Sequence, residues 1–562
     1  MKHKTVFLLV VLLASILRLY KLDRVPVSMF GDELDVGYHA YSILKTGRDY
    51  QGNFMPLHFH SLAEWRTPLY LYSTVPTVAI FGISPYGVRL PAAFFGIAGV
   101  IAVYLLVKKV TKTKRLAMFA AFLLTVSPWH IQYSRAAFEV TEMLFFLLMA
   151  LLFYFKAREK SKYLWVAVFF AMLMPWVYST SKLYVPLVLL TAIFIWRKWL
   201  ALIPLKHKIL AVGTGLVLGL PLIVVTLTGE GSQRFGYVSV FSDPTVVPEV
   251  GVDRWEDAKS RGETGEGLSP AIADRLIHNK YTVWLKVITN NYLQSFSTDF
   301  LFMNGDPNPR HSIDGIGEFY RIDSIMLLVG IIVFLKSKLE IKVKTFLVIL
   351  LLLSPISAAI TRDGGNHATR LILMLPFIVL LVSYGLNWLR KHKTAFVMCC
   401  LLYVVNFIFY QHNYWVHNPY QSERWWHAGW GEAIQLIKQD EKNYDKVIIS
   451  MAGEPAWIFF AAYMEYPPEA WQENFPIDNK TSLRGFGDVS HIAKYYFGTA
   501  NVEGGIYSLP SLIDGKTLYL ANAKEVGGNL IREPDKTPIG LKLIDSVAFP
   551  SGEPAFYLFT KS

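Results

Sequence analysis

The stretch Gly31-Asp32-Glu33-Leu34-Asp35 follows the first apolar segment of the chain. It places three carboxylates where a chain that leaves a membrane would meet water. Ionisable side chains at such a border are costly unless they are paired or functional. Neighbouring acids also suit general-base work, in which one carboxylate takes a proton from a reacting group. We therefore take this stretch as the first candidate for a catalytic loop. A solvated loop in which Asp32 caps a short helix is the structural alternative.

The composition around this stretch is that of a membrane protein. Hydrophobic residues make up 53% of the 562 residues, and apolar runs of membrane-spanning length recur along the chain. The formal net charge of +12 raises the question of nucleic-acid binding. Short basic clusters between the apolar runs, however, carry more positive charge than this whole excess, as the positive-inside rule expects of cytoplasmic loops. We therefore expect membrane lipid, and no nucleic acid, as a partner.

The apolar runs predict about eleven transmembrane helices. Their approximate bounds are 5–21, 86–107, 116–129, 138–155, 163–180, 183–196, 208–228, 322–335, 345–360, 370–389 and 394–412. The first run resembles a signal peptide but lacks a small-residue cleavage site, so we interpret it as an uncleaved helix. This topology places the N-terminus in the cytoplasm and the C-terminus outside.

Two long external loops interrupt the alternation of spans. The loop at about 22–84 contains a short apolar segment, Leu69 to Phe81, that predicts a helix lying in the interface. In the loop at about 229–320, the sequence near 270–295 predicts helices. We expect both loops to face the extracytoplasmic side.

The chain changes character near residue 420. Three segments have the pattern of strands and one that of a helix: 446–450, 518–521, 555–559 and 432–440. We therefore expect a membrane domain at 1–419 and a small extracytoplasmic α/β domain at 420–562. Cys399 and Cys400 are adjacent in an apolar run, so we expect neither a disulfide nor a metal site there.

Charged and aromatic residues gather at the expected external ends of the first helices. Asp35 and His39 are four residues apart and share a face if 34–44 is helical, with Tyr38 beside them. Arg66 begins the interfacial segment, where its planar fork of donors could clamp a phosphate. Snorkelling of this arginine to lipid head groups is the alternative interpretation.

A third cluster follows the run at 116–129. Arg135 and Glu139 are spaced by one helical turn and could form an ion pair, with His130 nearby. As surface residues they would be ordinary. At the mouth of a helix that enters the bilayer, they become candidates for contact with a substrate.

A fourth cluster lies between the spans at 345–360 and 370–389. His367 and Arg370 could reach a lipid phosphate there, although a charged interfacial loop is the plainer interpretation. Arg89 and Lys182 are weaker candidates of the same kind.

These motifs carry a resemblance to a known family. They are Gly-Asp-Glu-Leu-Asp-Val-Gly-Tyr-His-Ala-Tyr-Ser-Ile-Leu-Lys-Thr-Gly-Arg-Asp at 31–49, Arg-Thr-Pro-Leu-Tyr at 66–70, Val-Arg-Leu-Pro-Ala at 88–92, Ser-Pro-Trp-His-Ile-Gln-Tyr-Ser-Arg at 127–135, Asn-Gly-Asp-Pro-Asn-Pro-Arg-His at 304–311 and His-Ala-Thr-Arg at 367–370. In order and spacing, over roughly residues 25–410, the chain resembles the bacterial GT-C glycosyltransferases of the protein O-mannosyltransferase and aminoarabinose-transferase group, family 39.

The resemblance implies roles for residues of the first loop. Asp32 and Glu33 stand where the family has its acidic pair, so Asp32 would be the catalytic base. Arg66 stands where relatives often carry a lysine before a proline pair, a position associated with the lipid phosphate. Here arginine replaces the lysine and Thr67 replaces one proline.

The resemblance extends to the second external loop. Arg135 matches the arginine of that loop in the family. Glu139 follows it by four residues, whereas better-known members often place an aspartate five residues later. The fold that the resemblance implies is a GT-C bundle of about eleven helices with the small C-terminal α/β domain.

The function we expect is the inverting transfer of a sugar from a polyprenyl-phosphate donor to an acceptor hydroxyl of a protein, lipid or glycan on the extracytoplasmic face. Asp32 and Glu33 would be catalytic. The residues expected to bind substrate are Arg66, Arg135, Glu139, Tyr38, His130, His367 and Arg370. No cofactor is expected. Clustered acids can hold a divalent metal, but the resemblance argues against one.

Other classes of protein share some of these features. A polysaccharide ligase or polymerase also spans the membrane many times and uses lipid-linked oligosaccharide. A transporter would place its ionisable residues near the middle of the membrane, whereas here they gather at external helix ends. A purely structural membrane protein would tolerate the loss of Asp32 or Arg66.

Overall fold

The computed structural model of the chain describes residues 2–62, 65–229, 233–263 and 270–562. The chain divides into two compact units, each built from separate stretches of sequence. Unit 1 comprises Met1–Ala14, Gly96–Gln132 and Glu139–Ile408. Unit 2 comprises Ser15–Phe95, Tyr133–Phe138 and Phe409–Ser562.

Apolar helices account for most of unit 1. All eleven predicted spans coincide with helices: α1 (Lys2–Leu19), α4 (Pro85–Thr111), α5 (Lys114–Val126), α7 (Val140–Ala157), α8 (Leu164–Val177), α9 (Ser181–Ala201), α10 (Leu205–Leu227), α15 (Arg321–Leu335), α16 (Ile341–Leu353), α19 (Leu375–Leu389) and α20 (Lys393–His412). Within the described residues, seven helical segments are long and apolar enough to cross a membrane. The multi-spanning helical fold is therefore confirmed, whereas the count of eleven stays a prediction.

Two of these helices pack without side chains between their backbones. A Cβ atom added at Gly330 of α15 would lie 1.9 Å from the carbonyl oxygen of Leu381 on α19. One added at Gly385 of α19 would lie 2.2 Å from the carbonyl oxygen of Met326. Small residues at a crossing let membrane helices approach closely, so this glycine pair explains the tight packing of α15 on α19.

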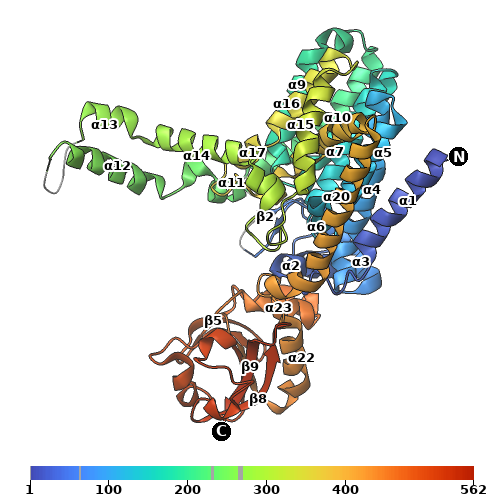
Figure 1. The fold of residues 1–562 in the computed structure, drawn as a ribbon. Helices are drawn as coiled ribbons and strands as arrows, with labels where there is room; N and C mark the ends of the chain where they lie inside the picture. Colours follow the sequence, from blue (N-terminus) through green and yellow to red (C-terminus); the bar gives the residue numbers. More distant parts are fainter. Residues whose placement is uncertain (1, 63–64, 230–232, 264–269) are drawn as a thin grey trace. The chain divides into compact units, whose positions relative to one another are not determined.

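The loop at 229–320 contains more helix than the sequence predicts. Its elements are α11 (Gln233–Val238), α12 (Val246–Ser260), α13 (Ile272–Ile277) and α14 (Lys280–Gln294). Figure 1 shows α12, α13 and α14 extending away from the apolar helices of unit 1. The helices expected near 270–295 are confirmed. Helix α12 was not predicted, because Pro248 and Gly251 interrupt its helical pattern.

The first loop forms part of unit 2. Helix α2 (Gly31–Thr46) ends at Gly47, whose φ of +70° suits the left-handed conformation of a helix C-terminus. A two-stranded ribbon follows, in which β1 (Phe59–His60) pairs antiparallel with β2 (Trp65–Arg66). The apolar segment Leu69 to Phe81 forms helix α3 (Leu69–Phe81), as predicted, whereas its place in the membrane interface stays a prediction.

The C-terminal part of unit 2 is a mixed sheet of seven strands in the order β4-β5-β6-β3-β7-β9-β8. The strands are β3 (Lys446–Ile449), β4 (Lys480–Leu483), β5 (Gly487–Ile492), β6 (Tyr495–Phe497), β7 (Thr517–Asn522), β8 (Leu541–Ala548) and β9 (Pro554–Lys561). Strand β3 lies parallel to both β6 and β7, and it is apolar on both faces as a central parallel strand must be. The three predicted strands and the predicted helix, α22 (Trp430–Asp440), are confirmed.

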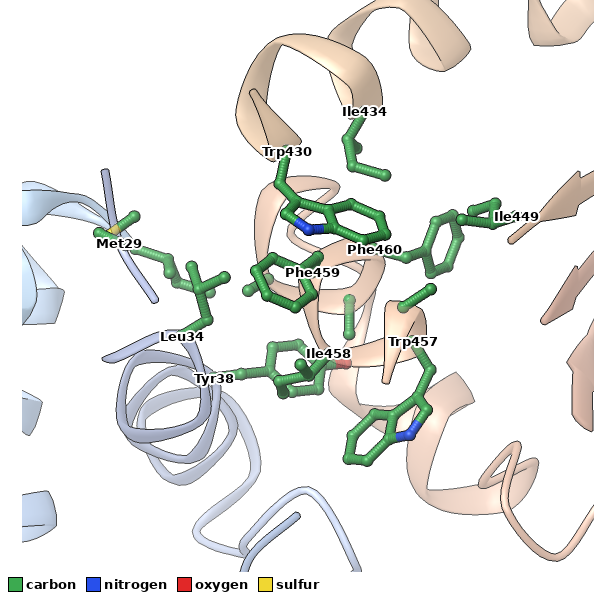
Figure 2. Packing of buried hydrophobic residues seen from close by; sticks show 14 of the residues in the cluster. Met29, Leu34, Tyr38, Trp430, Ile434, Ile449, Trp457, Ile458, Phe459 and Phe460 are labelled. Carbon is green, nitrogen blue, oxygen red and sulfur yellow. The ribbon is translucent and has the colours of Figure 1, made fainter. Parts of the chain in front are cut away.

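One hydrophobic core joins α2 to this sheet. Helix α23 (Ala456–Tyr463) lies between them, and Phe459 and Phe460 are completely buried. Figure 2 shows Leu34 and Tyr38 of α2 directed toward this helix. Burying each large apolar side chain contributes about 1.5–3 kcal/mol, so the C-terminal domain holds the acidic helix in place.

The two cysteines lie on α20. Cys399 is buried and Cys400 is exposed, and both are free thiols.

Candidate active site

Helix α2 presents the three acids of the opening stretch in its first turn and a half. Asp32 and Glu33 lie in the first turn, where the helix dipole favours negative charge. Asp32 and Asp35 are three residues apart and share a face, whereas Glu33 points elsewhere. The three carboxylates therefore meet three different environments.

Asp32 forms an ion pair at the edge of unit 2. Its Oδ1 atom lies 2.6 Å from Nη2 of Arg66, which the β1–β2 ribbon presents. The Asp32 side chain is 47% exposed and that of Arg66 10% exposed. The structure thus brings together two of the residues predicted to form the site, and it leaves the Asp32 carboxylate accessible.

Asp35 supports the same arginine from the buried side. Its carboxylate accepts hydrogen bonds from the hydroxyls of Tyr50, at 2.8 Å, and of Ser61, and its Oδ2 lies 3.8 Å from Nε of Arg66. Burial raises the pKa of the Asp35 carboxyl, against the opposing effects of Arg66 and the two hydrogen bonds. Arg66 is therefore held between an exposed and a buried carboxylate.

His39 follows Asp35 by one turn, as the spacing predicted. Its Nε2 lies 3.8 Å from Oδ1 of Asp35, and its ring stacks on Tyr50 with 3.8 Å between centroids. Complete burial lowers the pKa of His39 to about 3. His39 is therefore a neutral core histidine at physiological pH.

Glu33 forms a buried ion pair and is not an exposed acid. It is completely buried, and Arg89 of α4 binds both its oxygens, with Nε to Oε1 at 2.8 Å and Nη2 to Oε2 at 2.7 Å. The amide of Ala137 also donates to Oε1 at 2.9 Å. Arg89 further donates to the carbonyls of Leu22 and Pro26. The carboxylate of Glu33 therefore connects three segments of unit 2.

Arg135 has a comparable role at the end of α1. It is completely buried, and it donates to the carbonyls of Leu17 at 3.0 Å, Lys21 at 3.2 Å and Val25 at 2.8 Å. Its Nε donates to the hydroxyl of Tyr414 at 2.9 Å. The guanidinium therefore binds three carbonyl groups, one in the last turn of α1 and two in the segment after it.

The helix expected to place Arg135 and Glu139 one turn apart is interrupted, so this part of the prediction is wrong. Helix α6 (Pro128–Tyr133) ends before Arg135, and α7 begins only at Val140. Glu139 is the residue that precedes the first turn of α7, in unit 1. Pro128 favours the start of a helix, but residues 134–139 form turns, so helical spacing does not apply to them.

Tyr38 and His130 are buried. The hydroxyl of Tyr38 donates to the carbonyl of Tyr466 at 3.0 Å, and its ring packs on Trp471 in the core of unit 2. Burial raises the pKa of Tyr38. His130 lies on α6 in unit 1, beside Gly99 of α4. Each of the two side chains is therefore buried in the interior of its own unit.

His427 is a site residue that the sequence did not reveal. Its Nδ1 accepts a hydrogen bond from the amide of Gly31 at 3.3 Å, at the first residue of α2, and its Nε2 lies 3.2 Å from Oε1 of Glu454. His427 takes the place of the usual side-chain cap, because Phe30, the N-cap residue of α2, has no side chain that can accept a hydrogen bond. A residue almost 400 positions away thus caps helix α2. No local sequence pattern reports such a contact.

Unit 1 contains a separate cavity of about 340 Å³ with a mostly apolar lining. Arg370 of α18 (Ala368–Leu371) and Lys182 of α9 both line it. Nη1 of Arg370 donates to Oγ1 of Thr361 at 2.6 Å, which fixes the guanidinium at the wall. Two cations beside apolar walls suit a ligand with an anionic head and a hydrocarbon tail.

Comparison with known proteins gives a match over part of the chain. The model of a family described as dolichyl-phosphate-mannose-protein mannosyltransferase matches residues 66–225. A putative mannosyltransferase, YkcB of Bacillus subtilis (strain 168), is 37% identical over 92 residues, which are 16% of this chain. The match spans 13% of the length of that relative.

Two solved structures are also similar to the chain. The oligosaccharyltransferase of Archaeoglobus fulgidus gives a TM-score of 0.48 at 15% identity, over 82% of this chain and 61% of that one. ArnT from Cupriavidus metallidurans, bound to undecaprenyl phosphate, gives 0.42 at 11% identity, over 99% and 97%. The match of the family model over residues 66–225 agrees with the resemblance found in the motifs over that part of the chain.

Proposed function

We propose that the protein transfers a sugar from a polyprenyl-phosphate donor to an acceptor hydroxyl on the extracytoplasmic face of the membrane, with inversion. The observation that carries the proposal is the Asp32 carboxylate, which is 47% exposed and paired with Arg66 at 2.6 Å. Glu33 and Asp35, its neighbours, are buried. Asp32 is therefore the acid of α2 that an acceptor can approach.

The transfer is a single displacement. Asp32 takes the proton of the acceptor hydroxyl as its oxygen attacks the anomeric carbon of the sugar. The bond between that carbon and the phosphate oxygen breaks, and the polyprenyl phosphate leaves with the electron pair. Attack opposite the leaving group inverts the anomeric configuration. The proton ends on Asp32 and then passes to water.

Arg66 is a positioning residue in this proposal. Its planar guanidinium meets Asp32 through Nη2 and faces Asp35 through Nε, 3.8 Å away. This arrangement fixes the direction of the Asp32 carboxylate, which a general base needs before the acceptor arrives. Glu33 is also a positioning residue, because its ion pair with Arg89 fixes the start of α2.

Within unit 1, we propose that Arg370 and Lys182, which line one cavity, bind a lipid phosphate. Fixed cations suit the negative charge of such a head group. The apolar wall suits the first isoprene units of the carrier. Arg135 is left out of this role, because its guanidinium already serves three backbone carbonyls.

The orientation in the membrane follows from charge. In the topology predicted from the sequence, the basic clusters lie in loops on one side of the membrane. Asp32 and Arg370 lie in loops on the other side. We therefore propose a cytoplasmic N-terminus and an extracytoplasmic C-terminal domain. Nucleotide sugars are not available on that face, which is why the donor would be lipid-linked.

The donor class can be tested with the purified full-length protein in lipid nanodiscs. The donors are single-sugar polyprenyl phosphates, the matching nucleotide sugars and a lipid-linked oligosaccharide. The acceptors are a serine- and threonine-containing peptide, a hydroxylated glycolipid and an oligosaccharide. We expect transfer of one sugar from a polyprenyl phosphate, with the inverted anomer in the product. Transfer from nucleotide sugars, or en bloc transfer of the oligosaccharide alone, would contradict the proposal.

The donor cavity can be tested in the same assay. Arg370→Gln and Lys182→Gln should raise the KM for the donor and leave that for the acceptor unchanged, because both side chains line the same cavity. Arg362→Gln is a matched control, since Arg362 lies in the same loop and pairs with Asp243. An unchanged donor KM in both cavity variants would remove the cavity from the mechanism.

A further inference from the structure

Three potential metal ligands converge in unit 1. They are Asp306 and His311, which precede α15, and His367, which precedes α18. One ligand atom from each side chain lies within 4.8 Å of the other two. In the described part of the chain, this is the one group of three His, Cys, Asp or Glu side chains that converges in this way.

The carboxylate of Asp306 is the centre of the group. Its Oδ2 lies 2.9 Å from Nδ1 of His311 and 3.8 Å from Nδ1 of His367. The two imidazole rings lie 5.0 Å apart and are inclined by 32°. Both histidines therefore direct the same ring nitrogen toward one carboxylate oxygen.

The surrounding backbone holds Asp306 in this position. Its Oδ1 accepts from the amide of Asn308 at 2.8 Å, and its Oδ2 accepts from the amide of Ala368 at 2.8 Å. Its own amide donates to Oγ of Ser312 at 2.9 Å. Two backbone amides thus orient the carboxylate, as hydrogen-bond donors orient the carboxylate of a metal site.

We propose that Asp306, His311 and His367 bind a transition-metal ion of the Zn²⁺ class. Two imidazoles and one carboxylate suit Zn²⁺, whereas Mg²⁺ and Ca²⁺ prefer oxygen ligands. Bonds of about 2.0–2.2 Å in a tetrahedral site place two ligand atoms about 3.4 Å apart. The ligand atoms here lie between 2.9 Å and 4.8 Å apart, so small rotations of the side chains would close the site.

The burial of the three groups fits a bound ion that can exchange. The side chain of Asp306 is 4% exposed, that of His311 12% and that of His367 22%. An ion would therefore reach the site past the two imidazoles and meet a nearly buried carboxylate. Three protein ligands leave a fourth position for water.

The ion would connect two segments that are distant in sequence. His367 is three residues before Arg370, which lines the cavity described above. The ion would therefore tie the start of α18 to the loop before α15. This site lies outside the proposed transfer chemistry, and it departs from the expectation of no metal drawn from the sequence.

The metal content of the purified full-length protein tests the proposal. The protein is treated with a chelator, incubated with Zn²⁺, dialysed and analysed by mass spectrometry of the elements, with a parallel sample in Mg²⁺. We expect about one Zn²⁺ per chain and no retained Mg²⁺. In Asp306→Asn, His311→Ala and His367→Ala, Zn²⁺ affinity should fall by about tenfold or more. Loss of a residue that only hydrogen-bonds to a metal ligand already lowers metal affinity by about 10–100-fold.

His278→Ala is the matched control. His278 also meets two carboxylates, but its Nδ1 faces Asp253 at 3.3 Å and its Nε2 faces Asp257 at 2.9 Å. Opposite sides of one ring cannot hold one ion together, so this variant should keep the wild-type content.

X-ray absorption of the Zn²⁺-loaded wild type provides a measurement that does not depend on the folding of a variant. We expect two imidazole ligands. A wild type that retains no Zn²⁺, or a spectrum without two imidazoles, would show a hydrogen-bonded triad and overturn the proposal. Equal Zn²⁺ content in all variants would do the same. None of these readouts depends on sugar transfer.

Discussion

Asp32, Glu33 and Asp35 lie within one stretch of five residues, yet their side chains meet different surroundings. Helical spacing places Asp32 and Asp35 on one face, which the sequence could predict. It could not predict that Arg89, 56 residues away, would bind Glu33. Adjacent acids therefore have different proposed roles, one as a base and two as supports.

The ion pair of Glu33 and Arg89 should dominate local stability. We expect Glu33→Ala and Arg89→Ala each to lower the free energy of unfolding by about 3–5 kcal/mol, because each leaves a buried charge without its partner. The double variant Glu33→Ala with Arg89→Ala should lose less than the sum of the two single losses. Thermal unfolding in detergent measures all four proteins, with the exposed Glu159→Gln as control. Additive losses would contradict a coupled pair.

His39 should make the wild type sensitive to acid. The unfolded chain takes a proton at the ordinary histidine pKa of 6.5, whereas the folded protein resists it down to about 3. The unfolded state therefore binds more protons as the pH falls through this window, and stability falls by up to about 1.4 kcal/mol per pH unit.

The comparison with His39→Gln isolates this effect. Asp35 remains in both proteins, and its raised pKa acts in the opposite direction in each. Between pH 7.5 and 5, we expect the wild type to lose stability relative to the variant. Parallel stability curves for the two proteins would show that His39 takes its proton equally in both states.

At the scale of elements, the apolar runs predicted where helices lie but not how they pack. The spans, α3 and three of the seven strands of the C-terminal sheet, β3, β7 and β9, follow from the sequence pattern alone, whereas β4, β5, β6 and β8 were not predicted. The packing of α2 against α23 does not, because it joins residues more than 400 positions apart. The break between α6 and α7 was missed for a similar reason, since the turn at 134–139 is fixed by the buried Arg135.

The crossing of α15 and α19 should tolerate no added side chain. We expect Gly330→Ala and Gly385→Ala to lower the stability by about 1–3 kcal/mol, because the new Cβ would collide with a carbonyl oxygen. Gly213→Ala on α10 is the control, since nothing lies within 4 Å of its added Cβ. Thermal unfolding distinguishes them, and equal midpoints for the three variants would contradict the close crossing.

A substitution that weakens the core between α2 and α23 should also disturb the position of the proposed base, Asp32. Phe459 is completely buried and stacks on Trp430, with centroids 4.5 Å apart. We expect Phe459→Ala to cost about 3–5 kcal/mol and to reduce transfer. Ile539→Ala, at a side chain 97% exposed, should change neither. Full activity in a destabilised Phe459→Ala would show that α23 does not position Asp32.

At the scale of the whole molecule, the sequence predicted the class correctly. Apolar runs and strand patterns were enough for a chain with many apolar helices and a C-terminal sheet. They could not show that residues 15–95 and 409–562 share one compact unit. That arrangement rests on contacts such as the one from Gly31 to His427, which leave no local pattern.

The rate of sugar transfer by Asp32→Asn tests the central claim most directly. With a single-sugar polyprenyl phosphate as donor, kcat should fall by about 10²–10⁴, because the amide cannot take the acceptor proton. Asp23→Asn, at an exposed acid of the same loop that accepts from Tyr86, should keep the wild-type rate. An Asp32→Asn protein that is folded and transfers at the wild-type rate would contradict the account.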